Sequence, residues 1–212
     1  MSMVQFDELA GLRAFTRPLS VSDVESCVEV ESVFPPQERC SKEKFVYRLT
    51  VCPEICLGLF VETPEDEGTP TLIGHVIANR VSHGITDGSM ELPQNWSGGK
   101  DVVMVDGQVI GNDPNGRKIG VHSLAIRSEY QGKGIGRALM KEYIHFLRGS
   151  NESADSVVLI TYDRLVRFYE SVGFRNLGTS SCTFGGLVWN ALVSFPQSSQ
   201  GIITLILTRF RN

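Results

Sequence analysis

Apolar residues along the chain follow two patterns, one typical of strands and one typical of helices. Continuous or alternating apolar runs, bounded by Gly, Pro or polar residues, predict strands. These runs span 12–19, 55–62, 71–81, 121–126, 156–162, 174–178 and 187–193. Apolar residues spaced three or four positions apart predict helices. These segments span 21–33, 41–51, 135–148 and 163–172. The order of the elements predicts a mixed α/β fold.

The hydrophobic pattern is lost in two places. Between 82 and 118, Gly, Asp, Asn and Pro dominate, apart from a short apolar patch at 102–105. A loop this long inside a compact domain is often functional. The tail, 196–212, starts polar and ends in an apolar run that is either an extra strand or an irregular extension. We expect one domain over 1–195, with 82–118 as a long irregular loop, followed by a tail of uncertain structure.

Composition narrows the choice of partners and compartment. The net charge is -4, from 20 basic and 24 acidic residues, which argues against nucleic acid as the main partner. No apolar run is long enough to span a bilayer and the N-terminus lacks a signal-peptide core, so we expect a cytoplasmic protein without a membrane partner. The five cysteines form an odd set without metal-ligand spacing, which indicates reduced thiols.

The chain's most distinctive stretch is a glycine-dense turn between a strand and a helix. Gln131-Gly-Lys-Gly-Ile-Gly-Arg137 follows the apolar run at 121–126 and opens the helix predicted at 135–148. Glycine lets the backbone approach a ligand closely, and a helix N-terminus offers N–H groups and a favourable dipole to an anion. Lys133 and Arg137 add positive charge. The turn therefore predicts a phosphate or pyrophosphate site; the alternative is a glycine turn without a ligand.

The spacing of the glycines excludes two common phosphate motifs. The Walker pattern needs Ser or Thr after the loop lysine, but Gly134 follows Lys133. The dinucleotide pattern G-x-G-x-x-G fails because Gly136 comes one position too early. What remains is Gln-x-x-Gly-x-Gly after a strand, which resembles the acetyl-CoA loop of the GCN5-related N-acetyltransferases (GNAT).

This resemblance covers most of the chain and is nearest to the arylalkylamine (serotonin-type) N-acetyltransferase group, fungal members included. The stretches that carry it are Glu29–Phe34, Cys52–Phe60, His122–Ile126 and Phe168–Glu170. It implies a GNAT fold: a mixed central sheet of six to seven strands, about four flanking helices, and a splayed parallel strand pair at the acetyl-CoA site. It also implies acetyl-CoA as co-substrate and no metal.

Acetyl transfer to an amine needs a base and an acid. The resemblance assigns the base to His122, whose pKa suits proton transfer near neutrality. Where the animal enzymes have a second histidine, this chain has Gly120, which leaves His122 alone. The resemblance assigns the acid, which protonates the departing CoA sulfur, to Tyr169. The alternative for His122 is a strand-end histidine that bonds to the backbone, and the alternative for Tyr169 is an aromatic residue of the core. We expect His75 to be a core residue whose hydrogen bonds are satisfied.

The resemblance also implies the binding residues. The residues expected to bind acetyl-CoA are Leu124, Ala125, Ile126, Gln131, Gly132, Lys133, Gly134, Ile135, Gly136 and Arg137. The residues expected to line the substrate pocket are Phe34, Phe184, Leu187 and Trp189, with ordinary core packing as the alternative. Two large aromatic residues suit an aryl ring or an alkyl chain.

These observations predict an acetyl-CoA-dependent N-acetyltransferase that moves an acetyl group to a small primary amine, arylalkylamine or polyamine, by direct attack in a ternary complex. The alternatives are a protein or peptide N-acetyltransferase and a non-catalytic acyl-CoA sensor. Arg13-x-x-Thr16-x-Pro18 has the form of a 14-3-3 site but falls inside a predicted strand, so we do not expect a 14-3-3 partner. We expect a monomer or a weak homo-oligomer.

Overall fold

The computed structural model describes residues 2–3, 9, 11–62, 69–150 and 154–195, so the predictions for the tail at 196–212 lie outside the described residues. An eight-stranded mixed sheet forms its centre, in the order β1-β2-β3-β4-β7-β8-β10-β9. The strands are β1 (Ser2–Met3), β2 (Arg13–Pro18), β3 (Leu57–Glu62), β4 (Thr71–Val81), β7 (Lys118–Ile126), β8 (Ser156–Thr161), β9 (Arg175–Thr179) and β10 (Asn190–Ser194). The predicted mixed α/β sheet is confirmed. The sheet has one strand more than predicted, β1. It was not predicted because a pairing of two residues leaves no hydrophobic pattern in the sequence.

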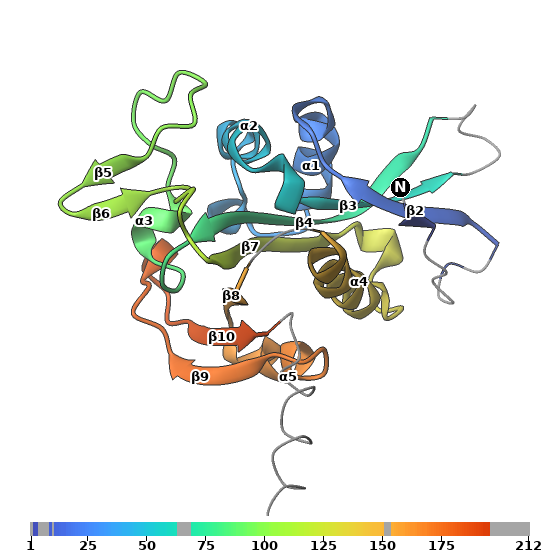
Figure 1. Ribbon diagram of the computed structural model, residues 1–212. Helices are drawn as coiled ribbons and strands as arrows, with labels where there is room; N and C mark the ends of the chain where they lie inside the picture. The colour runs from blue at the N-terminus through green and yellow to red at the C-terminus, as the bar shows by residue number, and fades with distance from the viewer. Residues whose placement is uncertain (1, 4–8, 10, 63–68, 151–153, 196–212) are drawn as a thin grey trace, which may run out of the picture.

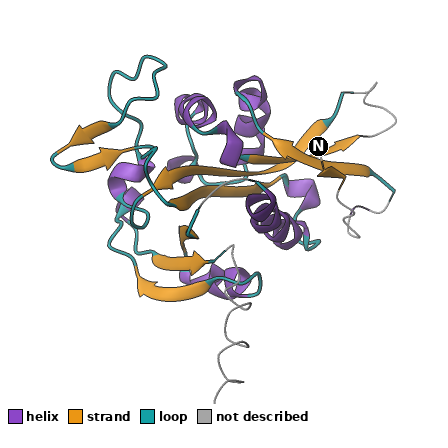
Figure 2. Cartoon of the chain, in the orientation of Figure 1, coloured by secondary structure: helices purple, strands orange, loops and turns teal. Residues whose placement is uncertain are grey.

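Helices cover both faces of the sheet (Figures 1 and 2). The helices in the described residues are α1 (Val24–Glu31), α2 (Lys42–Val51), α3 (Asp87–Met90), α4 (Ile135–Gly149) and α5 (Val166–Glu170). α1 and α2 lie on one face of the sheet and α4 lies on the other. Val30 of α1 and Phe45 of α2 are buried in one hydrophobic cluster. Leu139 and Tyr143 of α4 are buried in another. Within the described residues, no helix combines the length and the apolar character needed to cross a bilayer.

Two expected helix starts had different outcomes. Ser41 caps α2 as its position suggests, since its hydroxyl accepts a hydrogen bond from the Lys44 N–H at 3.3 Å. The segment predicted as a helix from residue 163 begins instead with a 3₁₀ turn, Asp163–Leu165, that leads into α5. The element predicted at 163–172 therefore contains only a short α-helix.

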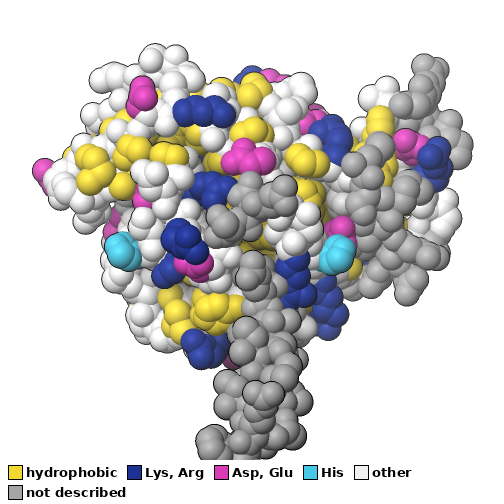
Figure 3. Space-filling view, in the orientation of Figure 1, with side chains coloured by type: hydrophobic (Ala, Val, Ile, Leu, Met, Phe, Trp, Pro, Cys, Tyr) yellow, Lys and Arg dark blue, Asp and Glu magenta, His cyan; other side chains and the backbone are white. Residues whose placement is uncertain are grey.

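The segment between β4 and β7 is more regular than the sequence analysis predicted. It contains α3 and a separate two-stranded hairpin of β5 (Val103–Val105) and β6 (Gln108–Ile110). The expectation of a long irregular loop over 82–118 was wrong in these two places. Asp106 and Gly107, both with positive φ, make the hairpin turn, and Asp-Gly is a strong signal for such a turn. Apolar side chains gather on this hairpin, where Met104 and Val105 are exposed (Figure 3).

The parallel pair β7–β8 is splayed, as the resemblance implied. The two strands pair from Lys118 with Ser156 as far as Val121 with Leu159. β7 then continues to Ile126 and β8 to Thr161 without pairing to each other. On the far side, β7 stays paired with β4 and β8 with β10. The separation therefore leaves the β8-facing main-chain edge of 122–126 open.

Candidate active site

The glycine turn has the backbone conformation that an anion site requires. Gly132 and Gly134 have φ of 73° and 83°, in the left-handed region that favours glycine. Gly134 is also the N-cap of α4, so no side chain caps the first helical N–H groups. The Gln131 amide donates to the Ile126 carbonyl at 2.8 Å, which fastens the turn to the end of β7. The turn thus presents a helix N-terminus beside the open edge of β7.

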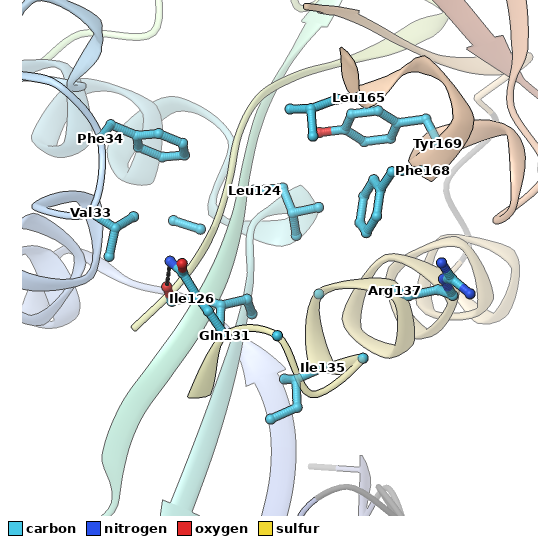
Figure 4. A pocket seen from close by; sticks show the side chains of 14 residues that line it. Val33, Phe34, Leu124, Ile126, Gln131, Ile135, Arg137, Leu165, Phe168 and Tyr169 are labelled. Carbon is cyan, nitrogen blue, oxygen red and sulfur yellow. Dashed lines mark hydrogen bonds between the residues drawn. The ribbon is translucent and has the colours of Figure 1, made fainter. Parts of the chain in front are cut away.

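A cavity of about 460 Å³ joins the turn to this open edge (Figure 4). Nine of the ten residues expected to bind acetyl-CoA line it: Leu124, Ala125, Ile126, Gln131, Gly132, Gly134, Ile135, Gly136 and Arg137. Lys133 is the exception among the expected residues. Its ammonium group donates to the Glu129 carbonyl at 2.9 Å and lies 5.7 Å from the centre of the Tyr130 ring. Its charge therefore remains close to the turn.

A second cavity of about 270 Å³ adjoins the first and is lined by all four expected substrate residues, Phe34, Phe184, Leu187 and Trp189. The two cavities share the side chains of Val33, Phe34, Leu124, Leu165 and Tyr169. Leu124 lies on β7 just beyond the point where β8 separates from it. The splay therefore connects a cavity with anion-binding character to a cavity with aromatic walls.

The aromatic wall is held in a fixed arrangement. The Trp189 indole N–H donates to the Phe184 carbonyl at 3.0 Å, and its ring centre lies 4.7 Å from that of Tyr162. Tyr162 also lines the second cavity. Burial, followed by the neighbouring carboxyl of Glu38, raises the pKa of Tyr162 to about 12. This placement was not predictable from the local pattern, because Tyr162 directly follows an ordinary apolar strand, β8.

Tyr169 lies between the two cavities. Its ring packs edge-on against Phe168 and Phe174, with ring centres 5.0 and 5.6 Å apart. Burial raises the pKa of its phenol well above the usual value, so the hydroxyl stays protonated. Figure 4 shows this hydroxyl directed into the gap toward Leu165 and Phe34. Tyr169 is therefore available as a proton donor at the junction of the cavities.

His122 lies in the wall of the second cavity, at an irregularity of β7. The pairing of β7 with β4 passes from Ser123–Ile77 to Val121–Ala78, so His122 is the extra residue of a β-bulge. Burial, together with the positive charges of Arg48 and Lys44 on α2, lowers the pKa of His122 well below 6.5. The imidazole is thus neutral at neutral pH and able to accept a proton.

A buried carboxylate, that of Glu31, forms part of the same cavity, although a helix carboxylate is usually solvated and the sequence analysis did not assign it to the site. Glu31 and Ser123 line the second cavity, although only 3% of Glu31 is exposed. The carboxylate accepts hydrogen bonds from the Ser123 hydroxyl at 2.7 Å and the Cys40 N–H at 2.9 Å, and lies 3.0 Å from His75 Nε2. Burial alone would raise the pKa of Glu31, but His75, Cys40 and Ser123 outweigh it and lower that pKa. Glu31 shares the apolar face of its helix with Cys27, which was the available signal.

His75 is fully buried, as expected of a core residue. It is not fully satisfied, however, because its Nδ1 has no hydrogen-bond partner in the described part of the chain. Its Nε2 faces Glu31, and its ring meets that of Phe45 edge-on at 5.6 Å. His75 therefore supports the Glu31 carboxylate from behind the cavity wall.

Comparison with known proteins agrees with this geometry. The family model of the acetyltransferase (GNAT) domain matches residues 61–191. Serotonin N-acetyltransferase of Mesocricetus auratus is 30% identical over 145 residues, which is 68% of this chain but only 57% of the hamster protein. The chain thus spans a little over half the length of this relative.

Solved structures share the fold at low sequence identity. The GphF GNAT-like decarboxylase in complex with isobutyryl-CoA has a TM-score of 0.63 at 15% identity, over 86% of this chain and 100% of that one. The ribosomal-protein-S18-alanine N-acetyltransferase from Escherichia coli has a TM-score of 0.55 at 14% identity, over 89% of this chain and 97% of that one. These likenesses concern the fold alone.

Proposed function

Because the chain belongs to the GNAT family of acyl-CoA-dependent acetyltransferases, we propose that it transfers the acetyl group of acetyl-CoA to a small primary amine. The observation that carries the proposal is the junction of the two cavities at Leu124 and Tyr169, just past the splay of β7 and β8. One cavity offers main-chain groups and a helix N-terminus to a pyrophosphate and its pantetheine arm. The other offers aromatic walls to an acceptor.

In this proposal, acetyl-CoA lies with its pyrophosphate against the turn at 131–137 and its arm along the open edge of β7. An unpaired strand edge presents N–H and C=O groups that can pair with the amide groups of pantetheine, as a neighbouring strand would. The main chain of 124–126 supplies the donor that stabilises the oxyanion as it forms on the thioester. The arm would then end beside Tyr169, which lines both cavities.

The proposed chemistry is a direct attack of the amine nitrogen on the acetyl carbonyl carbon. As the new C–N bond forms and the C–S bond breaks, the amine gives up a proton to the neutral His122, directly or through water. The departing sulfur takes a proton from the Tyr169 phenol. Holding both reactants at the junction makes the step effectively intramolecular.

The acceptor cavity favours an arylalkylamine. Phe34, Phe184 and Trp189 line it, and aromatic walls stack well on an aryl ring. The buried carboxylate of Glu31 in the same wall would attract an amine before it loses its proton. The name of the hamster relative, serotonin N-acetyltransferase, supports the same class of acceptor.

The test is acetyl-CoA turnover by the full chain, with the acetylated product identified by mass. The acceptors are tryptamine, phenylethylamine, spermidine and a panel of peptides with free N-termini. We expect acetylation of the two arylalkylamines in preference to spermidine and the peptides. Acetylation of peptides alone would make the protein a peptide N-acetyltransferase, and tight CoA binding without transfer to any acceptor would make it an acyl-CoA sensor. Either result overturns the proposal.

A further inference from the structure

The amide group of Asn79, on β4, has only one orientation that its surroundings allow. Asn79 is fully buried, and its Nδ2 donates to the carbonyls of Gly111 at 2.7 Å and Ser89 at 3.3 Å. Main-chain carbonyls accept hydrogen bonds and cannot donate them, so both amide hydrogens are committed to this side. The Asn79 Oδ1 must therefore be the atom that faces His122, at 2.6 Å from the ring nitrogen Nε2.

This orientation decides where the proton lies on the histidine ring. The Asn79 Oδ1 can accept a hydrogen bond but cannot donate one. Because it lies 2.6 Å from Nε2, Nε2 must carry the hydrogen. We propose that Asn79 is a positioning residue that holds His122 as its Nε2–H tautomer, so that Nδ1 is the atom that takes the proton from the amine. This role rests on the proposed function, in which His122 is the base.

The neighbours of Nδ1 fit such a role. Nδ1 lies 2.9 Å from the sulfur of Met90, and Met90 and His122 both line the acceptor cavity. A thioether sulfur is only a weak hydrogen-bond acceptor, so it competes weakly with the Asn79 oxygen for the single hydrogen of the neutral ring, and in the proposed reaction Met90 moves aside as the amine reaches Nδ1. The charged groups that act on the ring, Arg48 and Lys44 of α2, are both cations and oppose a second ring proton.

The supports of Asn79 come from the segment between β4 and β7. α3 provides both the Ser89 carbonyl that Asn79 binds and the Met90 sulfur that covers Nδ1. The second carbonyl, that of Gly111, directly follows β6. A segment that the sequence pattern left unassigned therefore fixes the orientation of the base.

Gly120 provides the space that Asn79 occupies. A Cβ on Gly120 would lie 3.2 Å from Asn79 Oδ1 and 2.7 Å from the Ile85 side chain. The resemblance places a second histidine of the animal enzymes at this position. A side chain at position 120 would crowd Asn79 Oδ1, the oxygen that accepts the hydrogen bond from His122. The glycine at this position therefore fits an arrangement in which Asn79 orients a single histidine.

The direct test is long-range ¹H–¹⁵N NMR of the full chain labelled with [¹⁵N]histidine, at neutral pH. The His122 signals are assigned as those that disappear in His122→Gln. We expect a neutral ring protonated at Nε2. A neutral ring protonated at Nδ1 would overturn the role of Asn79 while leaving His122 as the base. Full activity of His122→Gln would overturn the base itself, so the two failures can be told apart.

The variant test replaces Asn79 by Leu, which removes the amide but keeps the same branched arrangement of side-chain heavy atoms. We expect a mixture of the two neutral tautomers and a kcat lower by about 10- to 100-fold, which is less than the ~10²–10⁴-fold that a general base contributes, because part of the population keeps the productive tautomer. KM for acetyl-CoA should stay within about twofold, because its cavity does not include Asn79. The control is Asn112→Leu, since the buried Asn112 accepts from the Arg80 N–H at 2.8 Å and, among the described contacts, makes no hydrogen bond to the His122 ring. A kcat loss in Asn79→Leu with the wild-type tautomer intact would contradict the proposal.

Discussion

Replacing Glu31 by Gln should destabilise the protein far more than the same change two residues earlier in α1. Glu31 is 3% exposed and accepts hydrogen bonds from Ser123 and the Cys40 N–H, beside His75 at 3.0 Å. Glutamine has the same shape, but its NH₂ group must replace one acceptor oxygen. Toward Cys40 it would face an N–H; toward Ser123 and His75 it would require both groups to reverse their roles.

The expected loss follows from these contacts. Hydrogen bonds to a charged group contribute about 1.5–3 kcal/mol each, and a buried polar group left without its partner costs about 1–3 kcal/mol. Because the neutral amide keeps part of the hydrogen bonding, we expect a loss of about 3 kcal/mol in the free energy of unfolding. The control is Glu29→Gln, whose carboxylate is 63% exposed and pairs with Arg127 at 2.6 Å. An exposed pair contributes at most about 1 kcal/mol.

The assay is urea unfolding of both variants and the wild type, at pH 7 and at successively lower pH. The folded-state pKa of Glu31 is lowered, so its contribution is fully present above the unfolded pKa of about 4.3 and is lost as pH falls through the folded value. The difference between wild type and Glu31→Gln should thus be constant near neutrality and shrink in acid. Equal losses for the two variants, or a difference that grows in acid, would refute the reasoning.

Three further predictions concern the reaction. Tyr169→Phe should lower kcat and leave KM for acetyl-CoA unchanged, as steady-state kinetics would show. The control, Tyr143→Phe, loses a hydrogen bond to the Ile55 carbonyl in the core, so it should lower stability in thermal unfolding instead of kcat. The pH profile of kcat/KM should fall only well below pH 6.5, because the lowered pKa of His122 keeps the ring neutral until then, and His122→Gln should lack this fall; the same profile in wild type and variant would remove His122 as the base. Gly134→Ala, at φ 83°, should cost about 1–2 kcal/mol of stability and raise KM for acetyl-CoA, and an unchanged KM would argue against a pyrophosphate at the turn.

The parts of the fold that depend on local pattern were predictable. The run at 71–81 coincides with β4, and the helix predicted at 135–148 is α4 to within one residue. The β5–β6 hairpin was missed although Asp106-Gly107 was a readable signal for its turn, since two three-residue strands show little alternation.

The site was predictable only where a motif carried it. The glycines of the turn indicate its backbone conformation, and nine of the ten residues expected to bind acetyl-CoA, from the turn and from β7, line one cavity. The role of Asn79 could not be read from the chain, because its partners His122 and Gly111 are 43 and 32 positions away. The bulge at His122 likewise arises from the register between two strands, which no local pattern specifies.

The unpaired edge of β7 implies that the main chain and the side chains of this strand have different roles in binding. If peptide groups of this strand hold acetyl-CoA, substitutions of Leu124, which also lines the acceptor cavity, can reshape that cavity while the main chain still binds acetyl-CoA. Proline is the exception, since it would delete the N–H itself. Selection for new acceptors could therefore sample most residue types along this edge, and a proline scan would map which peptide groups hold acetyl-CoA.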